Sequence, residues 1–109
     1  MNKEYYKSEK GLEVKDVLQN DRTRFTEREA FYFGNIIKYI TRAGRKEEDI
    51  NESLSKADDY FKHLVLEHYY INDDERFRFK KYVTERIRTA CLSLGCVNNL
   101  KAFNLMIRN

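Results

Sequence analysis

The sequence predicts an all-α fold, a compact bundle of about five helices in a single domain spanning residues 1–109. Proline is absent, and glycine occurs only four times in the 109 residues. Apolar side chains recur at the three- and four-residue spacing of a helix, and no segment alternates with the period of two that a strand requires. Apolar residues make up 41% of the chain and aromatic residues 14%, which is enough for a modest core.

Two helices are expected in the first half of the chain. Residues 12–20 carry apolar side chains spaced for one helix face. Residues 27–43 follow Thr26, which can form a capping box with Glu29. Gly44 then suits the left-handed conformation in which many helices end.

Three further helices are expected in the second half. Residues 49–70 begin in an acidic segment, which suits the positive end of the helix dipole. Residues 75–94 follow a polar segment containing Asn72, a good capping residue, and precede the turn expected at Gly95. Residues 97–107 form a short last helix.

Several classes of protein do not fit this chain. It has no apolar signal core and no apolar run of about 20 residues, so we expect a cytoplasmic protein with no membrane partner. Cys91 and Cys96 do not have the spacing of a redox or zinc motif and read as small buried side chains. His63 and His68 lack further ligands nearby in sequence, so no structural metal is expected.

Charge is distributed unevenly along the sequence. Residues 34–46 hold 4 cations and no anions, residues 47–75 hold 2 cations and 10 anions, and residues 76–109 hold 8 cations and 1 anion. Such asymmetry is typical of pairing between helices, of a subunit contact or of a surface for an anionic polymer. The charge pattern allows two interpretations of the basic fourth helix. It could form a surface for nucleic acid, or it could pair with the acidic third helix.

The strongest functional pattern is a cationic stripe at the end of the second helix. At helical spacing, one amide and three cations, the last of them Arg45, share one face of a helix that is otherwise largely apolar. Two cations, Arg45 and Lys46, follow the terminal glycine. Arginine and lysine near a helix end can hold phosphate, and an adjacent tyrosine can pack on a base. The candidate residues for binding a nucleotide or phosphate are Asn35, Lys38, Tyr39, Arg42, Arg45 and Lys46.

The residues of the cationic stripe could instead have a structural role. Arg42 and Arg45 could pair with Glu48, Asp49 or Glu52 of the following segment. Asp49 and Glu52 also have the i,i+3 spacing that could hold Mg²⁺ together with a nucleotide. The chain contains neither a glycine-rich phosphate loop nor a dinucleotide-binding fingerprint.

The segment Gly-Asn-x-x-Lys-Tyr-x-x-Arg-x-Gly-x-Lys at residues 34–46 resembles a family of small phage proteins labelled "nucleotide kinase". The module also occurs in the T7-type phage nucleotide kinase, and the resemblance covers about residues 5–66. It implies a phage origin, action in the bacterial host cytosol, a nucleotide ligand and a homo-oligomer. Residues 72–109 would be a helical C-terminal extension.

These observations predict a phage accessory protein that binds a phosphorylated nucleotide, with nucleoside monophosphate kinase activity as the enzymatic version. Mg²⁺ would accompany the nucleotide in that version. One alternative is non-catalytic sequestration of a host signalling nucleotide. Another is an inhibitor that docks on a host protein or nucleic acid through the basic fourth helix.

Overall fold

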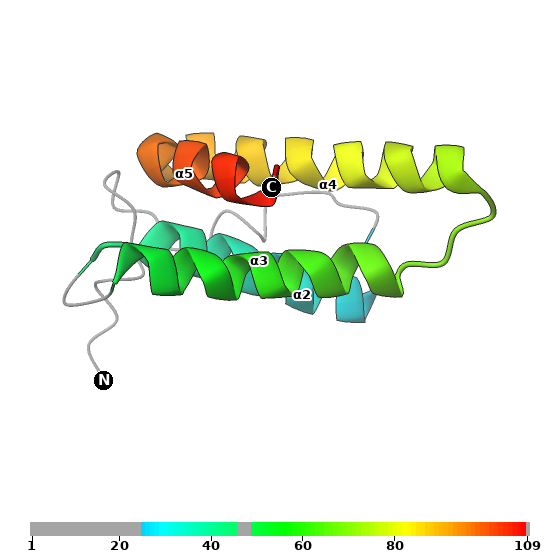
Figure 1. Cartoon of the computed structure of the whole chain (residues 1–109), viewed down its shortest axis with the longest axis horizontal. Coiled ribbons are helices and arrows are strands. Elements are labelled where there is room, and N and C mark those ends of the chain that lie inside the picture. The colour runs from blue at the N-terminus through cyan, green and yellow to red at the C-terminus, as the bar shows by residue number, and fades with distance from the viewer. Residues whose placement is uncertain (1–24, 46–48, 109) are drawn as a thin grey trace.

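The computed structural model describes residues 25–45 and 49–108. This part of the chain contains four α-helices and no strand: α2 (Glu27–Arg42), α3 (Ile50–Glu67), α4 (Asp73–Leu94) and α5 (Val97–Ile107). The helices form two layers (Figure 1), with the antiparallel pair α2 and α3 in one layer and α4 and α5 in the other. The all-α prediction is confirmed.

The helix ends show how the sequence sets these elements. Thr26 and Glu29 form the expected capping box, in which each side chain accepts a hydrogen bond from the other residue's backbone N–H, at 3.2 and 3.1 Å. Gly44 and Gly95 both adopt positive φ, 75° and 82°, just after the ends of α2 and α4. Glycine takes this conformation without the steric cost of a Cβ atom. Gly95 is the left-handed C-cap of α4, whereas α2 ends one residue earlier than expected, at the C-cap Ala43, and Gly44 lies in the turn that follows.

The expected helix count and some boundaries differ from the structure. Four helices rather than five lie in the described part of the chain, and the helix expected at residues 12–20 falls outside it. The third helix ends at Glu67 rather than at residue 70, because His68 leaves the helix to stack on Phe79 at 3.6 Å between ring centroids. The fourth helix begins two residues early, at Asp73, because Asn72 caps it by accepting a hydrogen bond from Glu75 N.

The core lies between the two layers and is built from the apolar faces of all four helices. Its fully buried side chains include Ile37, Leu64, Ile87 and Phe103. Phe103 of α5 packs edge-on against Phe61 of α3, with ring centroids 6.0 Å apart. Burial of such side chains is the main favourable term in folding.

α5 also closes the end of α2. The side-chain amide of Asn99 donates hydrogen bonds to the carbonyls of Ile40 and Ala43, at 2.9 and 3.0 Å. These carbonyls lie at the helix end, where backbone donors run out, and Ile40 O accepts only a long backbone hydrogen bond, from Ala43 N at 3.4 Å. The C-terminus of α2, the end of α4 and the start of α5 therefore meet at one end of the bundle (Figure 1).

Candidate functional site

The ring of Tyr39 lies at the centre of a cationic cluster. The Lys38 ammonium, the Arg42 guanidinium carbon and the Lys56 ammonium lie 5.5, 5.3 and 5.6 Å from the ring centroid. Lys38 and Arg42 come from α2 and Lys56 comes from α3, so the helix pair, rather than one stripe, builds this cluster. All three cations lie within the range of a cation–π interaction.

Tyr60 extends this cluster into an aromatic surface. Its ring is nearly parallel to that of Tyr39, with an interplanar angle of 13° and centroids 6.0 Å apart. An open pocket of about 390 Å³ lies beside the two rings and is lined by Tyr39, Lys56, Asp59, Tyr60 and His63. We call Lys38, Tyr39, Arg42, Lys56 and Tyr60 the Tyr39 site.

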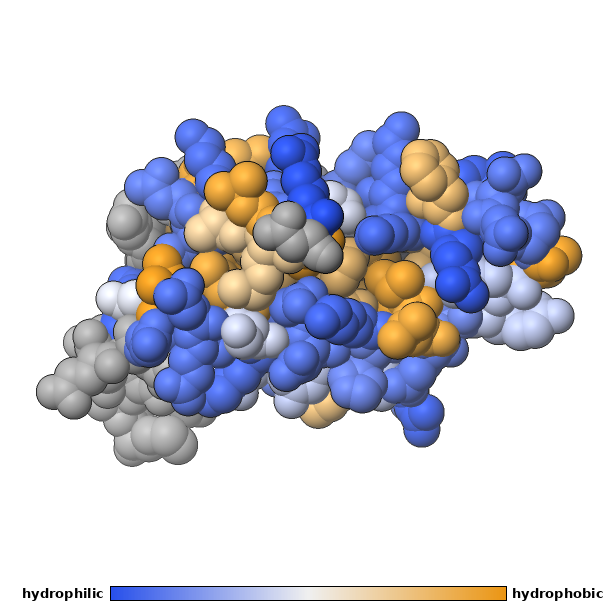
Figure 2. All heavy atoms as spheres, viewed as in Figure 1, coloured by the Kyte–Doolittle hydropathy of each residue, from blue (hydrophilic) through white to orange (hydrophobic). Residues whose placement is uncertain are grey.

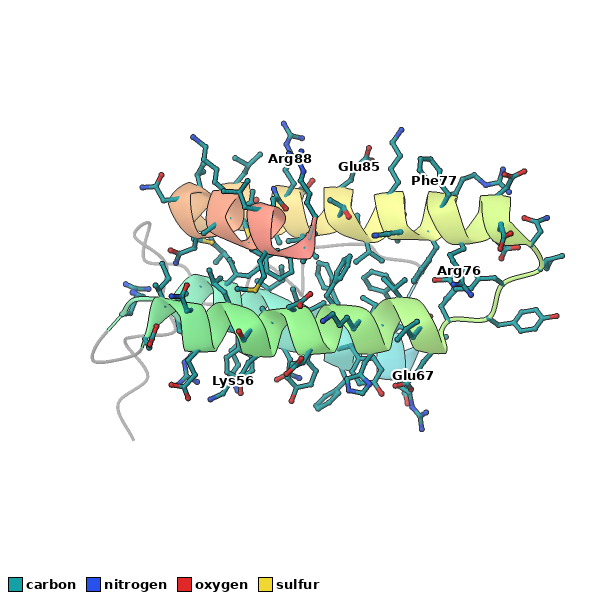
Figure 3. All side chains as sticks on the ribbon, in the orientation of Figure 1. Lys56, Glu67, Arg76, Phe77, Glu85 and Arg88 are labelled. Carbon is teal, nitrogen blue, oxygen red and sulfur yellow. The ribbon has the colours of Figure 1, made fainter. Side chains whose placement is uncertain are left out.

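The Tyr39 site lies on the side of the α2–α3 layer that faces away from α4 and α5. Figure 3 shows Lys56 and Glu67 of α3 pointing away from the other layer. Ile36, Leu54 and other apolar residues form the buried core of α2 and α3, and the partly buried Tyr39 and Tyr60 pack against it. A ligand can therefore reach this face without opening the core.

The aromatic surface continues to Glu67 at the other end of the helix pair. Tyr32 lies 6.3 Å from Tyr60 and stacks on His63, with centroids 5.7 Å apart. The Tyr32 hydroxyl donates to both Glu67 carboxylate oxygens, which lie 2.9 Å away. This hydrogen bond lowers the pKa of Glu67 and raises the pKa of Tyr32, because it stabilises the ionised carboxylate and the neutral phenol.

We expect Tyr32→Phe to raise the pKa of Glu67 toward its ordinary value of 4.5, because the main cause of its depression is removed. A carboxyl with a depressed folded-state pKa stabilises the fold above its ordinary pKa, and that contribution disappears as pH falls through the folded pKa. The variant should therefore lose less stability on acidification than the wild type. NMR titration of the Glu67 side-chain carboxyl measures the shift, and an unchanged pKa would contradict the assigned cause.

Other residues of the predicted stripe have different surroundings. The Asn35 side chain donates to the carbonyl of Phe31, one turn back on the same helix, at 2.9 Å. Arg45 follows the left-handed Gly44 and lines a different pocket, because the turn breaks the helical spacing that placed it with Lys38 and Arg42. Lys46 lies outside the described residues.

The proposed Mg²⁺ ligands have structural partners in the fold. Asp49 is the N-cap of α3 and accepts a hydrogen bond from Asn51 N at 2.8 Å. Glu52 forms an ion pair with Lys56 at 3.6 Å. No group of three or more His, Cys, Asp or Glu side chains suited to a metal occurs among residues 25–45 and 49–108. Mg²⁺ binding with a nucleotide stays a prediction.

Arg45 belongs to a second pocket, of about 310 Å³, where α2 meets the α4–α5 turn. Thr41, Cys96 and Asn99 also line it. A hydrogen bond from the Cys91 thiol lowers the pKa of Cys96, and the same bond together with burial raises the pKa of Cys91. Both thiols read from the sequence as small buried side chains, but Cys96 lines the pocket and Cys91 is fully buried, so we expect their reactivities to differ.

We expect iodoacetamide near neutral pH to modify Cys96 well before Cys91. Cys96 lines the pocket and has the lower pKa, whereas Cys91 is 0% exposed. Mass spectrometry of the peptides over time measures both rates, and Cys96→Ser should remove the fast phase. Equal rates for the two thiols would contradict this difference.

Sequence reasoning missed the contribution of α3 to the Tyr39 site. Lys56, Tyr60 and His63 recur at i, i+4 and i+7 and so share one face of α3. This polar and aromatic face opposite the apolar one was the available signal. It could not be assigned to Tyr39 without knowing how α2 and α3 pair.

Comparison with known proteins gives a family but no function. No helix among the described residues is long and apolar enough to cross a membrane. No curated protein and no solved structure matches the chain. One family model, described as a protein of unknown function (DUF3310), matches residues 2–62, more than half of the 109 residues. The expected membership of a nucleotide kinase family is therefore wrong, since the matching family carries no such label. The chain belongs to the DUF3310 family.

Proposed function

We propose that the protein binds a phosphorylated nucleotide at the Tyr39 site. The observation that carries this proposal is the convergence of three cations from two helices on one tyrosine ring beside an open pocket. The proposal requires binding only and includes no chemical step.

The cations supply the phosphate-binding part. Three cations within 5.6 Å of one ring centroid concentrate positive charge around it, which attracts an anion. Lys56 also pairs with Glu52 at 3.6 Å, and both side chains are exposed, so a phosphate would compete with this weak surface pair. A phosphate has several oxygens that can accept hydrogen bonds from such donors at once, so it suits this cluster better than a single carboxylate does.

The aromatic rings and Asp59 supply the part that recognises a nucleoside. The pocket beside Tyr39 and Tyr60 has about 390 Å³, within the usual range for small-molecule sites. Tyr39 and Tyr60 are partly buried, and a base can stack on the ring surface that remains exposed, which contributes about 1–3 kcal/mol per base. Asp59 in the same pocket accepts hydrogen bonds and repels anions, so it favours a ligand that carries amino or hydroxyl groups beside its phosphate.

Non-catalytic sequestration of a signalling nucleotide is the biological role that fits this proposal. It needs only the affinity of the Tyr39 site, with no acid, base or metal. A phage origin, a host partner, an oligomeric state and additional phosphate contacts from Asn35, Arg45 and Lys46 stay predictions.

Calorimetric titration of the full chain with adenosine, AMP, ADP and inorganic phosphate tests the proposal. We expect affinity to rise from adenosine to AMP to ADP, and phosphate alone to bind more weakly than AMP. Tyr39→Leu and Lys56→Gln should each weaken AMP binding by roughly 10-fold or more, since stacking and charged hydrogen bonds contribute about 1–3 kcal/mol each.

Arg88→Gln is the matched control for Lys56→Gln. Arg88 is an exposed cation on the other layer (Figure 3), so its loss changes net charge equally without touching the Tyr39 site. Its AMP affinity should equal that of the wild type. The proposal would be refuted if Lys56→Gln and Arg88→Gln weakened AMP binding equally. It would also be refuted if the wild type bound no nucleotide.

A further inference from the structure

We propose that the outer face of α4 binds the phosphate backbone of a nucleic acid without reading its sequence. We define this α4 basic face by Arg78, Lys81 and Arg88. It is separate from the Tyr39 site and lies outside the segment that matches the family model, which ends at residue 62.

The first support is an excess of exposed positive charge. Residues 76–108 carry eight cations and a single acid, Glu85. Seven of the eight are exposed, and Arg86 is partly buried. The eight are Arg76, Arg78, Lys80, Lys81, Arg86, Arg88, Lys101 and Arg108. Figure 2 shows predominantly hydrophilic side chains along the edge that α4 forms in this view.

The second support is that the acids of α3 do not neutralise this face. The acids of α3 pair with residues of α3 and α2, as in Lys62–Asp58 and Arg28–Glu67. Arg78, Lys81 and Arg88 take part in none of these pairs. The reason is geometric, because Arg88 and Glu85 point away from α3 (Figure 3).

The third support is the arrangement of the cations along the helix. At 100° per residue, Arg78, Lys81 and Arg88 fall within one outer arc of α4, away from the buried Val83 and Ile87. The exposed acids Asp74 and Glu85 fall within the same arc, so its net charge is +1. At 1.5 Å rise per residue they extend over roughly 15 Å. A duplex strand has a phosphate about every 3.4 Å along its axis, so a row of this length can contact several phosphates.

The surrounding side chains favour nucleic acid over a membrane. The apolar face of α4 is buried in the core, so the helix cannot insert it into a bilayer. Phe77 is 70% exposed at the start of the basic face and points outward (Figure 3). An exposed aromatic ring beside cations can stack on an unpaired base, which suits single-stranded nucleic acid.

Fluorescence anisotropy of the full chain with a labelled 20-nucleotide single strand of arbitrary sequence tests this inference. We expect binding that weakens with salt, with a log–log slope of about −2, since each phosphate contact on a single strand contributes about −0.7. Lys81→Glu/Arg88→Glu should weaken binding by at least 10-fold. A second strand of unrelated sequence should bind about equally well.

Arg28→Glu/Lys62→Glu is the matched control, because it makes the same change in net charge on exposed residues of the α2–α3 layer. It should weaken binding less than threefold. An equal loss in both double variants, binding that is insensitive to salt, or displacement of the strand by polyglutamate as readily as by unlabelled DNA would each overturn the assignment.

Binding of the single strand by the α4 basic face is proposed to be independent of the Tyr39 site. Tyr39→Leu should leave binding of the single strand unchanged, while Lys81→Glu/Arg88→Glu should leave AMP binding unchanged. Circular dichroism melting of each variant confirms that it is folded. Loss of strand binding in Tyr39→Leu would show that the Tyr39 site, rather than the α4 basic face, holds the strand.

Discussion

Replacing Phe103 with alanine is expected to destabilise the protein by about 3–5 kcal/mol, the usual cost of removing a buried aromatic side chain. Phe103 is 0% exposed and packs edge-on against Phe61, so the truncation leaves a cavity between the layers. It also weakens the anchoring of α5, whose Asn99 caps the end of α2 through two hydrogen bonds. Such a loss is a large share of the 5–15 kcal/mol by which domains are usually stable.

Urea unfolding followed by circular dichroism measures this change. Leu105→Ala is the control on the same helix, because Leu105 is 63% exposed and its truncation should change stability by less than about 0.5 kcal/mol. A small effect of Phe103→Ala, similar to that of Leu105→Ala, would mean that α5 does not pack on α3 as described.

Replacing Glu29 with alanine is expected to cost about 2–3 kcal/mol, because this largely buried side chain has two roles. One carboxylate oxygen accepts the hydrogen bond from Thr26 N that completes the capping box. The other is hydrogen-bonded to Nδ1 of His68, which stacks on Phe79 of α4. Loss of Glu29 therefore weakens the start of α2 and leaves a partly buried imidazole without its carboxylate partner.

Thr26→Ala separates the two roles. It removes one capping interaction, worth about 1 kcal/mol, but leaves Glu29 in contact with His68. In urea unfolding, Glu29→Ala should therefore be clearly the more destabilising of the two. Equal effects would show that the contact with His68 contributes nothing to stability.

The helices were largely predictable because local signals set their ends. The capping box at Thr26, the left-handed Gly44 and Gly95, and the last helix at residues 97–107 all follow from short-range sequence patterns. The end of α3 was not predictable in this way. His68 leaves the helix for partners on α2 and α4, and nothing next to it in the sequence indicates those contacts.

The candidate site was predictable only in part, for a similar reason. Helical spacing placed Lys38 and Arg42 on one face beside Tyr39, and the structure brings these three together. Helical spacing could not identify Lys56 and Tyr60, because they reach Tyr39 through the pairing of α2 with α3. Nor could it place Arg45, whose direction depends on the turn at Gly44.

The most direct test of nucleotide binding at the Tyr39 site is an NMR measurement of the full chain with AMP. The proposal predicts intermolecular NOEs between the base protons and the ring protons of Tyr39 or Tyr60, and shift changes at Lys56. It also predicts no comparable shift changes at Arg88 on the other layer. Saturating AMP that produces no such NOEs, or that shifts only residues of the pocket around Arg45 and Cys96, would contradict it.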